Sequence, residues 1–133
     1  LPEPRGTVVR RTRMMDGQPF SYTITFLPSE IGKKAVDVTA LRRSALMELL
    51  QKHGVVLQSA TQLIRAQLAD LDLCSRIDVE LGSPVLYVER CVNDSSGKPV
   101  EFVRSWYRGD RYEYTVNLDI EHPDQGGPYV KLA

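Results

Sequence analysis

Two pairs of polar residues in this chain have types and spacings suited to binding an acidic group. Arg11 and Arg13 are two positions apart, and Glu101 and Tyr107 are six positions apart. In a β-strand, residues an even number of positions apart lie on the same face. Two guanidinium groups on one face repel each other unless an anion or a carboxylate lies between them. Because the planar arginine fork can grip a carboxylate or phosphate in bidentate fashion, the pattern indicates anion binding.

Other interpretations of these residues stay open at this point. Arg11 and Arg13 can instead be solvated on an exposed face of a sheet, or paired with Glu101 and Glu89. Ser44, at the expected start of a helix, can offer its hydroxyl and free backbone N–H groups to an anion, but an ordinary helix cap explains it equally well.

The chain shows no pattern typical of catalysis or metal binding. His53 and His122 are not close to a Ser or Cys nucleophile with a third orienting group. Cys74 and Cys91 form no CxxC motif and have no nearby histidine, so they suggest neither a zinc site nor a disulfide framework. We therefore expect no catalytic residue, no metal and no cofactor.

Length and charge describe an ordinary globular domain. Of 133 residues, 42% are hydrophobic and 26% charged, and 17 Lys and Arg balance 17 Asp and Glu. Without an excess of positive charge the chain lacks the attraction to phosphate that dominates DNA binding. There is no signal-peptide pattern and no apolar run of about 20 residues. We expect one domain over 1–120, a loose tail over 121–133, a cytoplasmic location and no membrane contact.

The expected elements supply a sheet that can position the polar residues. Two hairpins are predicted, since turn residues at 16–19 and 94–97 separate segments of strand composition. Three-to-four-residue apolar spacing predicts a helix over 41–53 that ends at Gly54. The remaining expectations are a strand over 55–68, a short helix over 70–77 capped by Asp70 with Leu71, Leu73 and Ile77 on its apolar side, and a final strand over 112–118. Together they indicate an α+β fold: an antiparallel β-sheet with helices packed on one face.

Several motifs resemble the UTRA domain, the effector-binding domain of bacterial GntR-family repressors of the HutC subfamily. The resemblance extends over nearly the whole chain. Its most specific part is the closing segment Tyr107-Arg108-Gly109-Asp110-Arg111-Tyr112, which follows the turn Gly97-Lys98-Pro99 and Glu101. The matching segments nearer the N-terminus are Arg11-Thr12-Arg13, Asp16-Gly17-Gln18-Pro19, Ser44 to His53 and Gly82-Ser83-Pro84-Val85-Leu86.

The resemblance implies a fold similar to chorismate lyase and a homodimer. It also implies a small-molecule effector, a polar or anionic metabolite, and a winged helix-turn-helix that reads DNA from an N-terminal domain absent from this chain. Effector binding would then change how two DNA-reading domains are spaced. The segment 1–6 matches the family only loosely, so contacts made by a preceding strand are expected to be missing.

The same resemblance assigns roles to individual residues. Arg11 and Arg13 would bind the acidic group of the effector, while Glu101 and Tyr107 hold its polar body. The position of Thr23 is often acidic in relatives that bind amino sugars, so a hydroxyl there argues against a sugar amine. Ser44 completes the expected ligand-binding set. By contrast, Trp106 is expected in the core, and Arg108, Asp110 and Arg111 in a structural turn.

Two alternative functions compete with this one. Chorismate lyase cleaves an acidic substrate with buried Arg and Glu residues, but the closing segment 107–112 fits the UTRA pattern and not the lyase. A dimerisation module without a ligand is the third alternative. It predicts that Arg11→Ala and Glu101→Ala change neither stability nor any response to ligand. We expect a ligand sensor that is not an enzyme.

Overall fold

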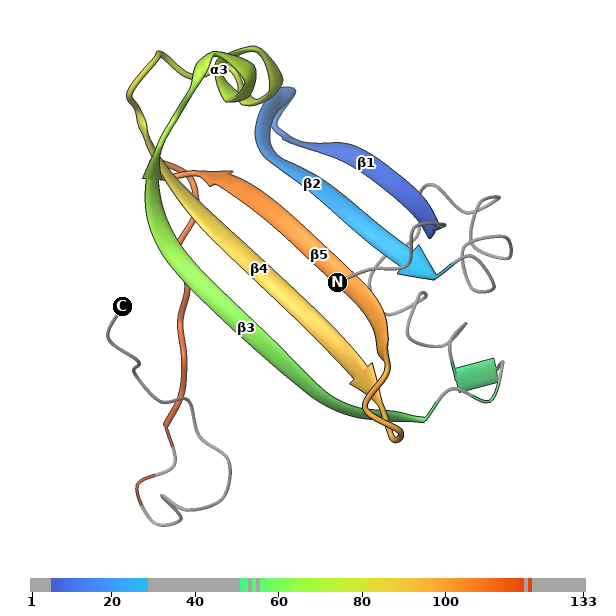
Figure 1. Cartoon of the computed structure of the whole chain (residues 1–133). Coiled ribbons are helices and arrows are strands. Elements are labelled where there is room, and N and C mark those ends of the chain that lie inside the picture. Colours follow the sequence, from blue (N-terminus) through green and yellow to red (C-terminus); the bar gives the residue numbers. More distant parts are fainter. Residues whose placement is uncertain (1–5, 29–50, 53, 55, 119, 121–133) are drawn as a thin grey trace.

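A five-stranded antiparallel sheet with the order β1-β2-β5-β4-β3 forms the body of the domain (Figure 1). The structure is a computed structural model that describes residues 6–28, 51–52, 54, 56–118 and 120, apart from the side chain of Leu57. The elements are β1 (Gly6–Met15), β2 (Gln18–Pro28), β3 (Leu57–Leu68), α3 (Leu71–Ile77), β4 (Pro84–Asp94) and β5 (Pro99–Arg108). The expected antiparallel α+β fold is confirmed.

Turn chemistry explains where the first hairpin reverses. Asp16 and Gly17 both have positive φ, 51° and 77°, and together they link β1 to β2. A two-residue turn with positive φ at both positions matches the right-handed twist of the flanking strands, and Asp-Gly is a preferred pair for it. In the second hairpin the Oδ1 atom of Asp94 accepts hydrogen bonds from the backbone N–H groups of Ser96 and Lys98, at 2.9 and 3.0 Å. Both predicted hairpins are confirmed.

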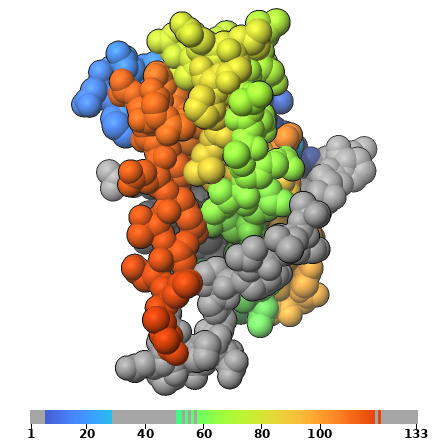
Figure 2. All heavy atoms as spheres, turned by 90° about the vertical axis from the view of Figure 1, so that its left-hand side faces the viewer, coloured from blue at the N-terminus to red at the C-terminus, as the bar shows by residue number. Residues whose placement is uncertain are grey.

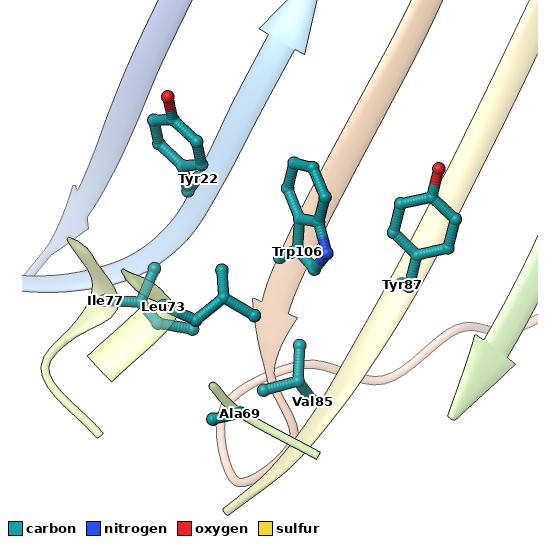
Figure 3. Close-up of a cluster of buried hydrophobic side chains, with 7 residues drawn as sticks. All are labelled: Tyr22, Ala69, Leu73, Ile77, Val85, Tyr87 and Trp106. Carbon is teal, nitrogen blue, oxygen red and sulfur yellow. The ribbon is translucent and has the colours of Figure 1, made fainter. Parts of the chain in front are cut away.

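Helix α3 packs on one face of the sheet, called here the helix face. Its Leu73 and Ile77 side chains point toward Tyr22 and Trp106 (Figure 3). The Tyr22 and Trp106 rings stack with centroids 6.0 Å apart. Trp106 is thus a core residue, as expected. The remaining members of this buried cluster are Ala69, Val85 and Tyr87.

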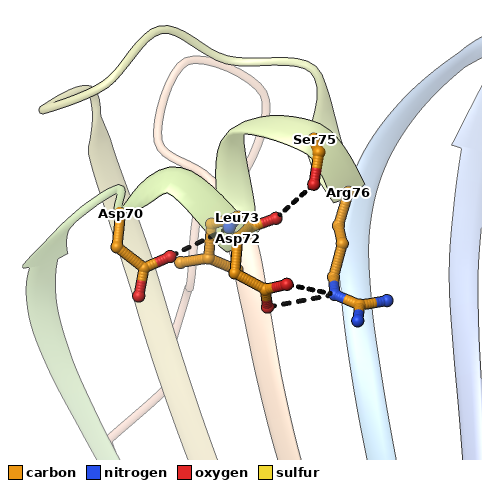
Figure 4. Close-up of polar contacts among 5 residues, drawn as sticks. All are labelled: Asp70, Asp72, Leu73, Ser75 and Arg76. Atoms are coloured by element: carbon orange, nitrogen blue, oxygen red, sulfur yellow. Dashed lines mark hydrogen bonds and ion pairs between the residues drawn. The ribbon is translucent and has the colours of Figure 1, made fainter.

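The start of α3 is fixed by the side chain that precedes it. Asp70 Oδ1 accepts a hydrogen bond from the backbone N–H of Leu73 at 2.9 Å, as expected of an N-cap (Figure 4). One detail of the prediction was wrong: Leu71 is 75% exposed instead of facing the core. Leu73 and Ile77, four positions apart, are the buried residues of this helix, and Cys74 packs beside them, whereas Leu71 lies on the opposite side.

The chain after β5 does not form the expected strand over 112–118, since residues 112–118 have no strand pairing. Strand β5 lies in the interior of the sheet between β2 and β4, so the chain leaving it cannot pair beside it and instead crosses a face. Figure 2 shows residues 109–118 in orange-red running beside β3. Side-chain contacts take the place of a backbone ladder there.

Two further expectations concern residues at the margin of the described part. Gln51 and Lys52 are helical and Gly54 has φ 77°, which agrees with the predicted C-terminal end of a helix. The rest of the predicted helix 41–53, with Ser44, lies outside the described residues, as does the tail 121–133.

Candidate functional site

The sequence-predicted polar residues lie mainly on the face of the sheet opposite α3, called here the site face. Arg11 is directly opposite Thr23, and Thr23 is directly opposite Ser105. Directly opposed residues in neighbouring strands project from the same face. Strand pairing therefore aligns one guanidinium and two hydroxyls in a row across β1, β2 and β5.

Hydroxyl groups join β2 to β5 in this row. Thr23 Oγ1 and Ser105 Oγ are 3.2 Å apart and share a hydrogen bond. Thr23 is half-buried and Ser105 is 5% exposed, so the pair is largely shielded from water. Arg11, next to Thr23, is also half-buried. An anion in contact with Arg11 would lie beside neutral hydrogen-bonding groups in a partly desolvated setting, where electrostatic attraction is stronger than in water.

A second row runs parallel to the first, two residues along each strand. Arg13 is opposite Ser21, and Ser21 is opposite Tyr107. Arg13 is exposed, Tyr107 is half-buried and Ser21 is 0% exposed. The predicted sharing of a face by Arg11 and Arg13 therefore agrees with the strand register, with Arg13 the more solvated of the two.

Glu101 lies on the same face at the far end of β5. It is four positions from Ser105, a separation of roughly 13 Å along a strand, and is only 2% exposed. A carboxylate removed from water to this extent needs compensating contacts. The area of the site face that lies between Arg11 and Glu101 combines these polar groups with the apolar Val103 of β5. The structure leaves Ser44 outside the described residues, so its place relative to this area stays an expectation.

Glu89, offered above as an alternative partner of the arginines, lies on the helix face instead. Its Oε2 accepts a hydrogen bond from the Tyr87 hydroxyl at 2.8 Å, and Arg104 Nε donates to the same hydroxyl at 2.9 Å. Burial raises the pKa of Tyr87, while the Arg104 hydrogen bond opposes that rise. Glu89 therefore cannot neutralise Arg11, because the sheet separates the two.

Side chains of the segment after β5 contact the site face at three points. The ring of Tyr112 stacks on Tyr107, Arg111 donates a hydrogen bond to Gln18 Oε1, and Gln62 Nε2 donates to the Tyr114 hydroxyl at 2.7 Å. Burial, with a smaller contribution from neighbouring Tyr107, raises the pKa of Tyr112. These contacts belong to β2, β5 and β3, so residues 111–114 span most of the sheet width.

Gln62 also links this segment to Arg90. Its Oε1 accepts from Arg90 Nε at 2.9 Å and from Arg90 Nη2. The role expected for Arg108 and Asp110 is confirmed, since Arg108 Nε and Nη2 donate to the two Asp110 carboxylate oxygens at 3.1 and 2.9 Å. That pair lowers the pKa of Asp110. Both residues serve a turn and lie apart from the row of Arg11.

Some residues of this area lie outside the ligand-binding set expected from the sequence. Ser21 and Ser105 follow from strand alternation, because they are two positions from Thr23 and Tyr107 respectively. Gln62 and Arg90 required knowledge that β3 pairs with β4 in this register. Among the described residues no group of three or more His, Cys, Asp or Glu is arranged to hold a metal ion. No helix in the described part is long and apolar enough to cross a bilayer.

Comparison with known proteins relates this chain to a known domain family. The UTRA domain family profile matches residues 3–113. The HTH-type transcriptional regulator Rv0792c of Mycobacterium tuberculosis is 28% identical over 126 residues, covering 92% of this chain and 47% of the relative. The chain spans about half the length of the curated relatives it matches.

Solved structures share the fold. A GntR-family transcriptional regulator from Enterococcus faecalis V583 superposes with a TM-score of 0.73 at 24% identity, covering 88% of this chain and 84% of that one. The effector domain of PhnF from Mycobacterium smegmatis gives a TM-score of 0.71 at 21% identity, over 86% and 70% of the two chains. Since the family profile matches most of its length, the chain belongs to the UTRA domain family.

Proposed function

We propose that this chain is the effector-binding and dimerisation domain of a cytoplasmic GntR-family transcriptional regulator of the HutC type, and that it is not an enzyme. Its effector is a small polar or anionic metabolite, and DNA is bound by a separate N-terminal domain. The relatives support this proposal because they are transcriptional regulators about twice as long as the matched segment.

The observation that carries the ligand proposal is the row formed by Arg11, Thr23 and Ser105. It combines a cation with two hydroxyls on one face, and the second row adds Arg13 and Tyr107. In our proposal the acidic group of the effector lies against Arg11 and Arg13, and its polar body extends toward Glu101. Ser44 would complete the site.

The regulatory step follows from differential affinity. A ligand that binds one arrangement of the dimer more tightly shifts the equilibrium toward that arrangement. The ratio of its affinities for the two arrangements limits the size of the shift. Because a ligand on the site face would contact β1, β2 and β5 together, it would fix the position of the β1–β2 hairpin against the rest of the sheet. We propose that the position of this hairpin determines how the dimer spaces its two DNA-binding domains.

Thermal unfolding of the chain against metabolite classes tests the proposal. A ligand at one hundred times its Kd adds about 2.7 kcal/mol and raises the midpoint by several degrees. The Arg11→Ala, Arg13→Ala double variant should lose this shift. The control is Arg10→Ala, because Arg10 pairs with Ile24 and projects from the helix face. An equal shift in the double variant would contradict the assigned site.

A further inference from the structure

The buried hydroxyl of Ser21 is the feature of the site face that the proposed function does not yet use. Among the described residues, Ser21 Oγ is the buried side-chain oxygen or nitrogen without a hydrogen-bond partner, and Ser21 as a whole is 0% exposed. Most buried polar groups in proteins have a hydrogen-bond partner. Leaving such a group without a partner costs more free energy than an ordinary hydrogen bond contributes. An unpaired hydroxyl at this position calls for an explanation.

The surroundings of Ser21 connect it to the candidate site. It is two positions from Thr23 on an uninterrupted stretch of β2, so the two side chains project from the same face roughly 7 Å apart. Arg13 and Tyr107 are its direct neighbours across β1 and β5. Ser21 is therefore enclosed by residues that were predicted to bind a ligand.

The chemistry of the group sets what it can recognise. A serine hydroxyl can donate one hydrogen bond and accept others. Ser21 shares a face with the hydroxyls of Thr23 and Ser105, which bond to each other and not to Ser21, and with the guanidinium of Arg11. These groups are called here the polar cluster. Such a cluster suits a ligand that carries a hydroxyl next to its anionic group, because the anion meets the arginine and the hydroxyl meets the cluster.

We propose that Ser21 is a specificity-determining residue of this site and that the site selects hydroxylated anions over anions of equal charge without a hydroxyl. This inference rests on the proposed function, since it assumes that an anion binds beside Arg11. It adds the class of ligand, and it assigns a ligand contact to a residue outside the expected set.

Charge-matched pairs of small anions test the selection. Calorimetric titration of the chain with succinate and malate, and with propyl phosphate and glycerol 3-phosphate, compares ligands that differ in hydroxyl groups. The hydroxylated member of a pair should bind about threefold to tenfold more tightly, the range expected of one or two hydrogen bonds. In Ser21→Ala the ratio of affinities should fall toward one, while the weaker ligand keeps its affinity.

The stability of ligand-free Ser21→Ala provides a second readout. Removing an unpaired hydroxyl should leave the thermal midpoint unchanged or raise it, whereas removing a hydroxyl bonded to an internal water should lower it. Ser75→Ala is the matched control, because Ser75 lies in α3 and its hydroxyl donates to the backbone of Asp72. It should leave the ratio of affinities unchanged.

The outcomes separate the two proposals. Binding of both members of each pair with equal affinity would overturn the role of Ser21 but preserve the anion site. A hydroxyl preference that survives Ser21→Ala, together with a lowered thermal midpoint, would assign Ser21 to an internal water and overturn this inference. Failure of all four anions to bind would overturn the proposed anion site and the inference with it.

Discussion

The ring of Tyr112 lies on the ring of Tyr107, with centroids 3.8 Å apart and planes inclined by 18°. Tyr107 is a proposed ligand-binding residue in β5, and Tyr112 belongs to the segment that crosses the site face. The stack therefore restrains the ring of Tyr107 through a residue only five positions further along the chain. Because an aromatic pair restricts ring rotation, Tyr112 acts here by positioning Tyr107.

Replacing Tyr112 by leucine should destabilise the chain by about 0.5–1.5 kcal/mol through loss of the ring contact, beyond the change in buried area. Tyr112→Phe keeps the ring and is the control, with a smaller effect expected. Urea denaturation measures both variants. Equal stability of Tyr112→Leu and Tyr112→Phe would show that the stack contributes little to stability.

The cap of α3 should matter more than the surface ion pair beside it. Asp70→Ala removes the acceptor for the Leu73 N–H and should cost about 1 kcal/mol. Asp72→Ala removes an exposed pair with Arg76, in which Asp72 Oδ2 and Arg76 Nε are 3.0 Å apart. Exposed pairs in helices contribute about 0.3–0.5 kcal/mol. Chemical denaturation of the two variants should rank Asp70→Ala as the more destabilised, and the reverse order would contradict the capping role.

Truncation should destabilise the domain to very different extents at two apolar residues of the same helix. Ile77 is 0% exposed, so Ile77→Ala should destabilise the domain by about 2–5 kcal/mol through lost burial and a residual cavity. Leu71 is 75% exposed, and Leu71→Ala should change stability by less than about 0.5 kcal/mol. Thermal and urea unfolding distinguish the two. A large loss in Leu71→Ala would mean that this leucine is covered in solution.

The turn between β4 and β5 should stabilise the fold by an amount that falls at acid pH. Hydrogen bonds from Ser96, and then from the backbone of Lys98, lower the pKa of Asp94. Because the folded pKa is below the unfolded one, the contribution is present above the ordinary carboxyl range and is lost as the pH falls through the folded pKa. NMR titration should show Asp94 ionising at lower pH than a model peptide, and Ser96→Ala should raise that pKa toward the ordinary range.

Local chemistry explains the part of the fold that was predictable. The Asp16-Gly17 turn, the Asp70 cap and the strand composition of both hairpins each act within a few residues, so the sequence is sufficient to place them. The row of Arg11, Thr23 and Ser105 depends instead on the pairing of β2 with β5, whose members are 82 residues apart. Local patterns carry no information about such a pairing. The family resemblance assigned Arg11 and Thr23 to one site, whereas Ser105 joins the row through the observed strand register.

The segment 112–118 shows how a correct periodicity can predict the wrong element. Its alternation arises because Tyr112 and Tyr114 both reach the site face, at Tyr107 and Gln62. A segment that crosses a sheet with alternate side chains down has the same period of two as a strand within it. Whether its backbone pairs depends on the position of β5 inside the sheet, which no local pattern reveals.

The pairing of β2 with β5 also determines when the candidate site comes into existence during folding. The β1–β2 hairpin and the β4–β5 hairpin each close over short loops, whereas joining them pairs residues such as Thr23 and Ser105, which are 82 positions apart. Loop closure over such a separation is slow compared with hairpin formation. A metabolite that contacts both Arg11 and Ser105 would stabilise the pairing of these strands in the folded state. Its clearest kinetic effect should therefore be a lower unfolding rate.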